Sequence, residues 1–275
     1  MKIRQVNETQ FINPTTPLAI YILGLLWADG YILPPYTITL TTTYPDAKYF
    51  IPSFLKTGKW KYYDKEFPNN PTWKRGCFIK TSNIPLVNFL LENDYKSKSY
   101  ESADKILSII PDNLKHYWFR GLLDGDGCIH TDNKGSHSIS FSSSVNQNWS
   151  YLQNLCNKLK LNCHTIKEYR SGHSGSSFKV YSMYKTIKFC EYVYNGYPED
   201  GIGLKRKYDR FLQLKITEEK NRYRGVSQKK NGKWRAYTSG AKGIKPKHLG
   251  VFFKREDALK CVENFYSNHT KTFLT

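Results

Sequence analysis

Two aspartates stand directly after helix-length apolar segments of the sequence. Asp29 follows YILGLLWA and Asp126 follows YWFRGLLDG, and a glycine comes after each of them. The C-terminal end of a helix carries partial negative charge and free carbonyl groups, so a carboxylate there is unfavourable unless a cation joins it. Oxygen ligands suit a hard cation such as Mg²⁺, which can activate water for phosphodiester hydrolysis. The doubled pattern therefore indicates a metal-assisted phosphoryl-hydrolysis centre.

Each of the two apolar segments also contains a glycine near its middle, Gly24 and Gly121. Glycine costs about 1 kcal/mol relative to alanine inside a helix. Close approach of two helix backbones is one physical reason to accept that cost. If the two helices pack side by side about a pseudo-two-fold axis, their ends bring Asp29 and Asp126 together.

The order of predicted elements repeats along the chain and indicates an α+β fold. An apolar helix, strands, a hairpin and further helices occur up to residue 111, and a second series of the same kind occupies residues 116–216. The two Asp-Gly pairs are 97 residues apart, which is the length of one repeat. We predict two pseudo-symmetric αββαββα repeats, followed by a small three-stranded sheet with one helix. The predicted boundaries are 1–112 and 113–216 for the repeats, 217–221 for a linker and 222–275 for the last domain.

The charge of the chain favours a polyanionic partner. The formal net charge is +19, and residues 221–275 alone hold 13 Lys and Arg against 3 Asp and Glu. Such a balance indicates nucleic acid ahead of a membrane. The six cysteines form no C-x-x-C pair, and the first ten residues do not look like a signal peptide. We expect a soluble intracellular protein, in the cytoplasm of a bacterium or phage-infected cell or in an organelle.

The segments ILGLLWADG (22–30) and FRGLLDGDG (119–127) resemble the LAGLIDADG motif of homing endonucleases, and two copies in one chain resemble the single-chain members. The resemblance covers roughly residues 15–216. It implies that Asp29 and Asp126 bind metal, with the carbonyls of Ala28 and Gly125 as candidate further ligands. The first copy departs from the motif at Trp27, where the second copy keeps Asp124.

The same resemblance implies basic residues beside the scissile phosphates, and Lys98 and Lys207 are the candidates. Each repeat would also lay a curved sheet in the major groove of DNA, where hydroxyl and basic side chains contact bases or phosphates. The candidates for these contacts are Thr39, Thr41, Lys59, Lys61, Lys74 and Arg75 in the first repeat, and Ser140, Ser142, Lys167, Arg170 and Lys179 in the second.

The C-terminal segment YRGVSQKKNGKWRAY, with HLGVF and EDAL after it, resembles the Apetala-type (ethylene-response-factor) DNA-binding domain. In that family a three-stranded sheet enters the major groove and a helix backs it. The candidate contacts here are Arg224, Ser227, Lys229 and Tyr237, whereas Trp234 and Phe252 are expected in the core.

The resemblance implies a monomeric, Mg²⁺-dependent endonuclease that cuts double-stranded DNA at a long asymmetric site and leaves short 3′ overhangs. Such an enzyme promotes the mobility of its own gene or of a host intron. Two alternatives stay open. One is an RNA-binding maturase that acts on intron RNA, and the other is a non-catalytic DNA-binding regulator.

Overall fold

The computed structural model describes residues 7–65, 76–132, 136–170, 173–222, 225–238 and 247–270. The chain divides into two compact units, Met1–Phe211 and Leu212–Thr275, which are described separately below. Among the described residues, no helix is both long enough and apolar enough to cross a membrane.

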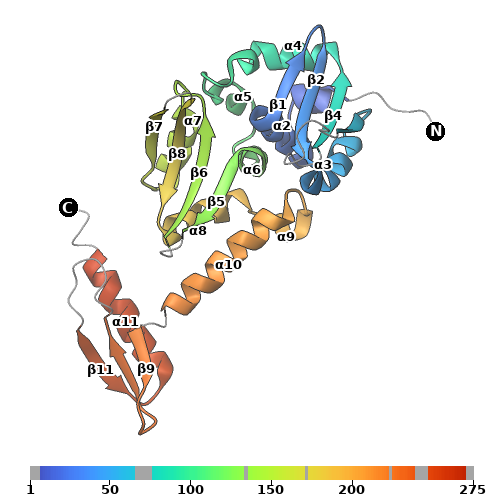
Figure 1. Ribbon diagram of the computed structural model, residues 1–275. Helices are drawn as coiled ribbons and strands as arrows, with labels where there is room; N and C mark the ends of the chain where they lie inside the picture. Colours follow the sequence, from blue (N-terminus) through green and yellow to red (C-terminus); the bar gives the residue numbers. More distant parts are fainter. Residues whose placement is uncertain are drawn as a thin grey trace. The chain divides into compact units, whose positions relative to one another are not determined.

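The first unit contains two copies of an αββαββα arrangement, as predicted (Figure 1). Short helices α1 (Thr9–Ile12), η1 (Tyr95–Ser97), α5 (Asp104–Ile109) and α9 (Tyr197–Asp200) accompany them. The first copy consists of α2 (Pro17–Asp29), β1 (Gly30–Leu33), β2 (Thr37–Thr43), α3 (Tyr44–Lys56), β3 (Lys61–Lys65), β4 (Gly76–Ser82) and α4 (Ile84–Glu92). The second consists of α6 (Lys115–Gly125), β5 (Gly127–Thr131), β6 (His137–Ser143), α7 (Ser150–Lys158), β7 (His164–Arg170), β8 (His173–Tyr181) and α8 (Met183–Val193). Helix α10 (Lys205–Arg222) begins in the first unit, and its residues from Leu212 onward belong to the second.

Each copy builds one four-stranded antiparallel sheet, in the order β1-β2-β4-β3 and β5-β6-β8-β7. Successive side chains of a strand point to opposite faces, so one face of each sheet can be apolar. Ile38, Leu40 and Ile79 fill the covered face of the first sheet, and Phe141 and Val180 do so in the second. The opposite faces carry hydroxyl and basic side chains, which is the arrangement that the strand alternation predicts.

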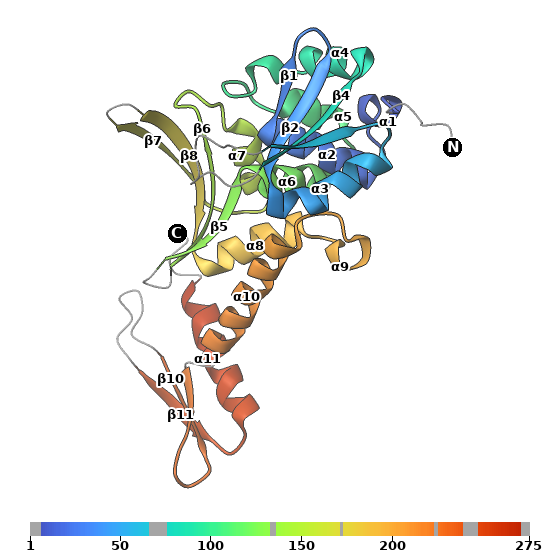
Figure 2. The ribbon, with the colours of Figure 1, turned by 45° about the vertical axis from the view of Figure 1, so that its right-hand side comes forward.

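Helices α2 and α6 lie side by side between the two sheets (Figure 2). Every residue of α2 from Ala19 to Trp27 is buried, because the neighbouring helix and the first sheet cover this helix. A Cβ atom at Gly24 would collide with the Trp118 carbonyl oxygen, and one at Gly121 would collide with the Tyr21 carbonyl oxygen. The predicted close approach of the two backbones is confirmed.

Some elements differ from the sequence-based expectation. The αββαββα pattern includes a helix between the two strand pairs of the first repeat, but it was not assigned to the residues of α3. Pro45 lies in the first turn of α3, where proline is tolerated, whereas Pro52 lies inside the helix, where proline is unfavourable. Burial of Ala47, Phe50 and Phe54 compensates for that interior proline. Strands β1 and β5, which begin at the glycines of the two Asp-Gly pairs, belong to the predicted pattern but were not assigned to these residues. Residues 217–221, expected as a linker, belong to α10.

The second unit has a three-stranded antiparallel sheet and one helix, as predicted. Its sheet has the order β11-β10-β9, formed by β9 (Val226–Gln228), β10 (Trp234–Tyr237) and β11 (His248–Phe252). Helix α11 (Arg255–Thr270) packs on one face through Ala258 and Val262. Trp234 and Phe252 pack against this core, which confirms their predicted role.

Candidate active site

Asp29 is the last residue of α2, and Asp126 directly follows α6. The close packing of the two helices brings these ends together. A Cβ atom on Gly125 would lie 3.2 Å from the Asp29 Oδ2 atom, so that carboxylate rests on the end of the neighbouring helix. The site therefore concentrates two acidic side chains where two helix ends already carry partial negative charge.

The surroundings of the two carboxyl groups oppose their ionisation. Burial raises the pKa of Asp29, against the opposing effect of Lys98 and Lys207. Dense packing around the Asp126 carboxyl raises its pKa to about 6, and the negative charge of Asp29 adds to this shift. Asp126 still has the more exposed side chain of the two, so water screens part of this effect.

Lys98 and Lys207 lie at the ends of α2 and α6, in equivalent positions of the two repeats. The Lys98 Nζ atom donates to the carbonyl oxygens of Trp27 at 2.5 Å and Ala28 at 2.6 Å, with a longer contact of 3.3 Å to that of Leu26. The Lys207 Nζ atom donates to three carbonyl oxygens at 2.5–2.8 Å, those of Leu123, Asp124 and Gly127. Each ammonium group thus satisfies free carbonyls of a helix end and offsets their partial negative charge.

Burial also affects the protonation of these lysines. It lowers the pKa of Lys98 to about 8, against the opposing effect of Asp126 and Asp29. It lowers the pKa of Lys207 as well, against the effect of Asp124. The structure brings both predicted lysines into the electrostatic environment of the two predicted aspartates. The neighbouring Lys96 and Lys205 are exposed instead, and Lys205 pairs with Asp209 at 2.7 Å.

The two lysines are positioned by different means in the two repeats. Near Lys98, the Tyr95 hydroxyl donates to the Leu26 carbonyl at 2.6 Å, and Trp27 packs its ring against Tyr95 and Trp118. Near Lys207, the buried Asp124 carboxylate accepts hydrogen bonds from the Leu204 amide at 2.7 Å and the Tyr21 hydroxyl at 2.9 Å. In the first repeat, the aromatic packing of Trp27 therefore takes the place of the hydrogen bonds that Asp124 accepts in the second repeat.

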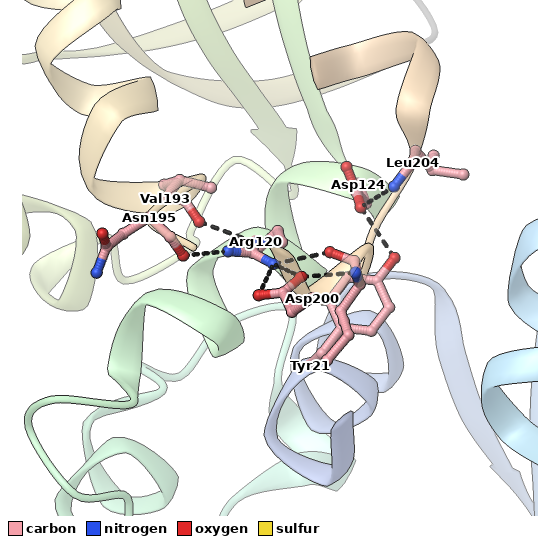
Figure 3. A network of polar contacts seen from close by, with 8 residues as sticks. Tyr21, Arg120, Asp124, Val193, Asn195, Asp200 and Leu204 are labelled. Atoms are coloured by element: carbon pink, nitrogen blue, oxygen red, sulfur yellow. Dashed lines mark hydrogen bonds and ion pairs between the residues drawn. The ribbon is translucent and has the colours of Figure 1, made fainter. Parts of the chain in front are cut away.

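A second buried contact set holds the segment that precedes α10 (Figure 3). The Arg120 guanidinium, fully buried in α6, donates to the carbonyls of Val193 and Asn195 and forms an ion pair with Asp200 at 3.0 Å. It also donates to the Ile202 carbonyl at 2.8 Å. Together with Asp124, these contacts fix residues 193–204 to α6 and so place the first turn of α10.

The residues at the helix ends fit a divalent cation of the Mg²⁺ type. The described part of the chain contains no cluster of three or more His, Cys, Asp or Glu side chains. Two carboxylates suffice, because Mg²⁺ takes one or two of them and completes its shell with water and substrate phosphates. Burial raises the pKa of Asp29 and of Asp126, so a cation bound between these carboxyl groups would favour their ionised form. Of the two candidate carbonyls, that of Ala28 already accepts a hydrogen bond from Lys98.

The uncovered face of the first sheet carries some of the predicted DNA contacts. Lys59 and Lys61 are exposed and line an open groove of about 700 Å³. Thr41 lines a hollow beside Asp29. Thr39 points to the same face but is only 1% exposed, so other side chains cover it. Lys74 and Arg75 lie outside the described residues.

Two further side chains of this groove, Lys80 and Tyr63, were not among the predicted contacts. Lys80 pairs directly with both Thr39 and Lys61 across the strands, and its ammonium lies 4.6 Å from the ring centre of Tyr63. The alternation of Cys77, Ile79 and Thr81 on the covered face could have placed Lys80 on the open one.

On the second sheet, the register separates the predicted residues. Ser140 pairs with Lys179, and Ser142, two residues along the strand, shares their uncovered face. Lys167 pairs with Ser176, which is buried and hydrogen-bonded to Trp149. Lys167 therefore lies on the opposite face from Lys179, contrary to the prediction. The side chain of Arg170 lies outside the described residues.

The open face of the second unit's sheet contains two of the candidate contacts, Ser227 and Tyr237, together with Arg235. Arg235 pairs with Ser227 and Val251 across the strands and lies 5.7 Å from the ring centre of Tyr237. Strand alternation in WRAY could have identified Arg235, because Trp234 and Ala236 belong to the core. Lys229 is exposed in the turn after β9, and Arg224 lies outside the described residues.

Comparisons with known proteins give one family model and several solved structures that match the chain. Residues 113–224 match the family model of the LAGLIDADG-like domain. No curated protein matches the chain. This part of the chain, which contains the second repeat, is thus similar to the LAGLIDADG-like domain.

Solved structures that match the chain include both a full-length protein and DNA complexes. The chain matches full-length DUF199/WhiA from Thermatoga maritima with 14% identity and a TM-score of 0.45, covering 77% of this chain and 65% of that one. The chain thus covers less than two thirds of WhiA. It matches I-SmaMI bound to an uncleaved DNA target in the presence of calcium ions with 14% identity and a TM-score of 0.45, covering 75% of this chain and 92% of that one. The LAGLIDADG meganuclease I-CpaMI bound to uncleaved DNA matches with 13% identity, a TM-score of 0.43, and coverage of 76% and 94%.

Proposed function

We propose that the chain is a site-specific endonuclease that hydrolyses both strands of duplex DNA in the presence of a divalent cation. The observation that carries this proposal is the placement of Asp29 and Asp126 at adjoining helix ends, each with a lysine of its own repeat beside it. The proposal includes Mg²⁺ as the cofactor, a monomer as the active form, and a long asymmetric site that is cut with short 3′ overhangs.

The protein's own groups have defined tasks in this reaction. Asp29 and Asp126 would hold the metal, together with the carbonyls of Ala28 and Gly125 and the oxygens of the scissile phosphates. When bound, such a cation activates water and stabilises the charge that develops on the leaving oxygen. Lys98 and Lys207 keep the helix ends from repelling the incoming phosphates and add positive charge where negative charge develops in the transition state. The buried apolar side chains of α2 and α6 hold the two helices in place, and with them Asp29 and Asp126.

The two sheets supply the binding surface. Lys59, Lys61 and Lys80 on the first sheet, and Ser140, Ser142 and Lys179 on the second, are available for phosphate and base contacts. The sheet of the second unit would add contacts through Ser227, Lys229, Arg235 and Tyr237, in the manner of an Apetala-type domain. Because every neutralised phosphate releases counterions, we expect affinity to fall steeply with salt.

The experiment is cleavage of a randomised duplex library by the purified full-length protein with Mg²⁺, followed by sequencing of the new ends. One enriched site with staggered ends supports the proposal, and Asp29→Asn and Asp126→Asn should each reduce cutting to a nick or abolish it. Full activity in either variant would overturn the catalytic assignment. Retention of library DNA without any cutting would identify a non-catalytic DNA-binding protein, and intron RNA would then be the next substrate to test for a maturase.

A further inference from the structure

We propose that Arg206, oriented by Asp46, is a phosphate-binding residue on the Asp29 side of the active site, and that it makes the protein cut one DNA strand faster than the other. This inference rests on the proposed endonuclease function. It concerns a residue that lies outside the two motifs and the two lysines.

Arg206 lies in the first turn of α10, beside Lys207. Its Nε atom donates to Asp46 Oδ1 at 2.7 Å, and its Nη2 atom donates to Asp46 Oδ2 at 2.6 Å. Asp46 is mostly covered in the first turn of α3, whereas the Arg206 side chain is 54% exposed. The paired carboxylate fixes the plane of the guanidinium and uses its Nε hydrogen and one Nη2 hydrogen. The other Nη2 hydrogen and the two Nη1 hydrogens point away from Asp46. Such an arginine is suited to two-point recognition of a phosphate.

The exposed guanidinium borders a hollow of about 400 Å³ beside the catalytic centre. The residues that line this hollow include Arg206, Gly125 and three carboxylates, those of Asp29, Asp46 and Asp124. Asp46 is paired with Arg206, and Asp124 accepts hydrogen bonds from Tyr21 and the Leu204 amide. Asp46 is near enough to Asp29 to contribute to the raised pKa of Asp29, after the larger effect of burial. A phosphate that approaches Asp29 therefore enters a space that has Arg206 at its edge.

The hollow on the Asp126 side is built differently. It measures about 40 Å³, and apart from Lys98 and Asp126 the residues that line it are neutral. Ser97 precedes Lys98 where Arg206 precedes Lys207, and its hydroxyl bonds to the Asp94 carbonyl at 3.3 Å. Ser143, the last residue of β6, donates to Gln147 at 2.8 Å, and both side chains line this hollow. Among the described residues, this side thus has a neutral serine–glutamine contact where the other has an arginine–aspartate pair.

A structural role is the competing explanation, because the Arg206–Asp46 pair joins α10 to α3. The two roles differ in what they predict for the separate strands. Loss of a structural contact would slow the cutting of both strands together or lower the stability. Loss of a phosphate contact on one side would slow the cutting of one strand alone.

The experiment uses the full-length protein and a duplex target labelled differently on its two strands. For the wild type we expect unequal first-order cutting rates. Arg206→Gln should slow the faster strand by about tenfold, and the other by less than about twofold, a difference of about 1.4 kcal/mol in barrier. Arg206→Lys should restore part of that rate. Arg210→Gln, an exposed change one turn further along α10, is the matched control and should leave the strand ratio unchanged.

The double variant Asp46→Ser with Arg206→Ser keeps the test valid if a lone charge harms folding. It removes both charges and copies the neutral chemistry of the Asp126 side, so the two rates should become similar. Equal slowing of both strands by Arg206→Gln, or an unchanged strand ratio in the double variant, would overturn the inference. If the wild type cuts neither strand, the proposed function itself has failed.

Discussion

Gly24 of α2 and Gly121 of α6 face each other's helices so closely that neither position has room for a Cβ atom. A Cβ on Gly24 would also lie 2.9 Å from the Trp118 carbonyl carbon, and one on Gly121 would lie 2.7 Å from the Leu25 amide nitrogen. These neighbours are backbone atoms, which cannot rotate away. The short distance between the two helices therefore requires glycine at both positions. The placement of Asp29 and Asp126 at adjoining helix ends depends on that short distance.

Replacing either glycine by alanine should destabilise the first unit. The gain of about 1 kcal/mol in helix propensity is smaller than the cost of forcing two packed backbones apart, so we expect a net loss of about 2 kcal/mol or more. Urea denaturation of Gly24→Ala and Gly121→Ala measures it. Gln153→Ala, an exposed helix position, is the control. A change of less than about 0.5 kcal/mol would contradict the close packing.

Replacing Trp27 by aspartate, the residue of the LAGLIDADG motif at this position, should destabilise the first unit. Trp27 is 4% exposed and packs on Tyr95 and Trp118, so Trp27→Asp removes an aromatic core residue and buries a carboxylate. We expect a loss of at least about 3–5 kcal/mol in the free energy of unfolding. Trp27→Phe keeps most of the packing and should cost less. Near-wild-type stability of Trp27→Asp would show that a polar anchor like that of Asp124 can form in both repeats.

Much of this architecture could be predicted, because the repeated motif, the two mid-helix glycines and the net charge are local signals. The residues of helix α3 could not be assigned, because its interior Pro52 is tolerated only through tertiary burial of the neighbouring Phe50 and Phe54. The face of Lys167 depends on which residue it pairs with, and a shift by one residue exchanges the faces of a strand. Arg206 was passed over because its importance comes from Asp46, 160 residues away in the sequence.

The buried Arg120 contacts should contribute far more to stability than an exposed ion pair of the same chemistry. Arg120→Met leaves the carbonyls of Val193 and Asn195, and the partner Asp200, without the guanidinium, so we expect a loss of about 3–5 kcal/mol. Lys205→Met breaks the exposed pair with Asp209 and should leave the free energy of unfolding almost unchanged. Denaturation of both variants checks the contrast. Similar effects would mean that the network does not hold residues 193–204.

Neutralising Asp126 should stabilise the metal-free protein while it removes activity. Burial and Asp29 raise the pKa of Asp126 to about 6, so ionisation costs more in the folded chain than in the unfolded one. The penalty is absent below about pH 4, where both states are protonated, and is complete above the folded-state pKa. Asp126→Asn should therefore raise the melting temperature at pH 7–8 and have little effect at pH 4. Because the side chain is partly exposed, we expect a gain of no more than about 1 kcal/mol. Thermal denaturation in chelator across this pH range is the measurement, and a stabilisation that is equal at both ends of the range would rule out ionisation as its cause.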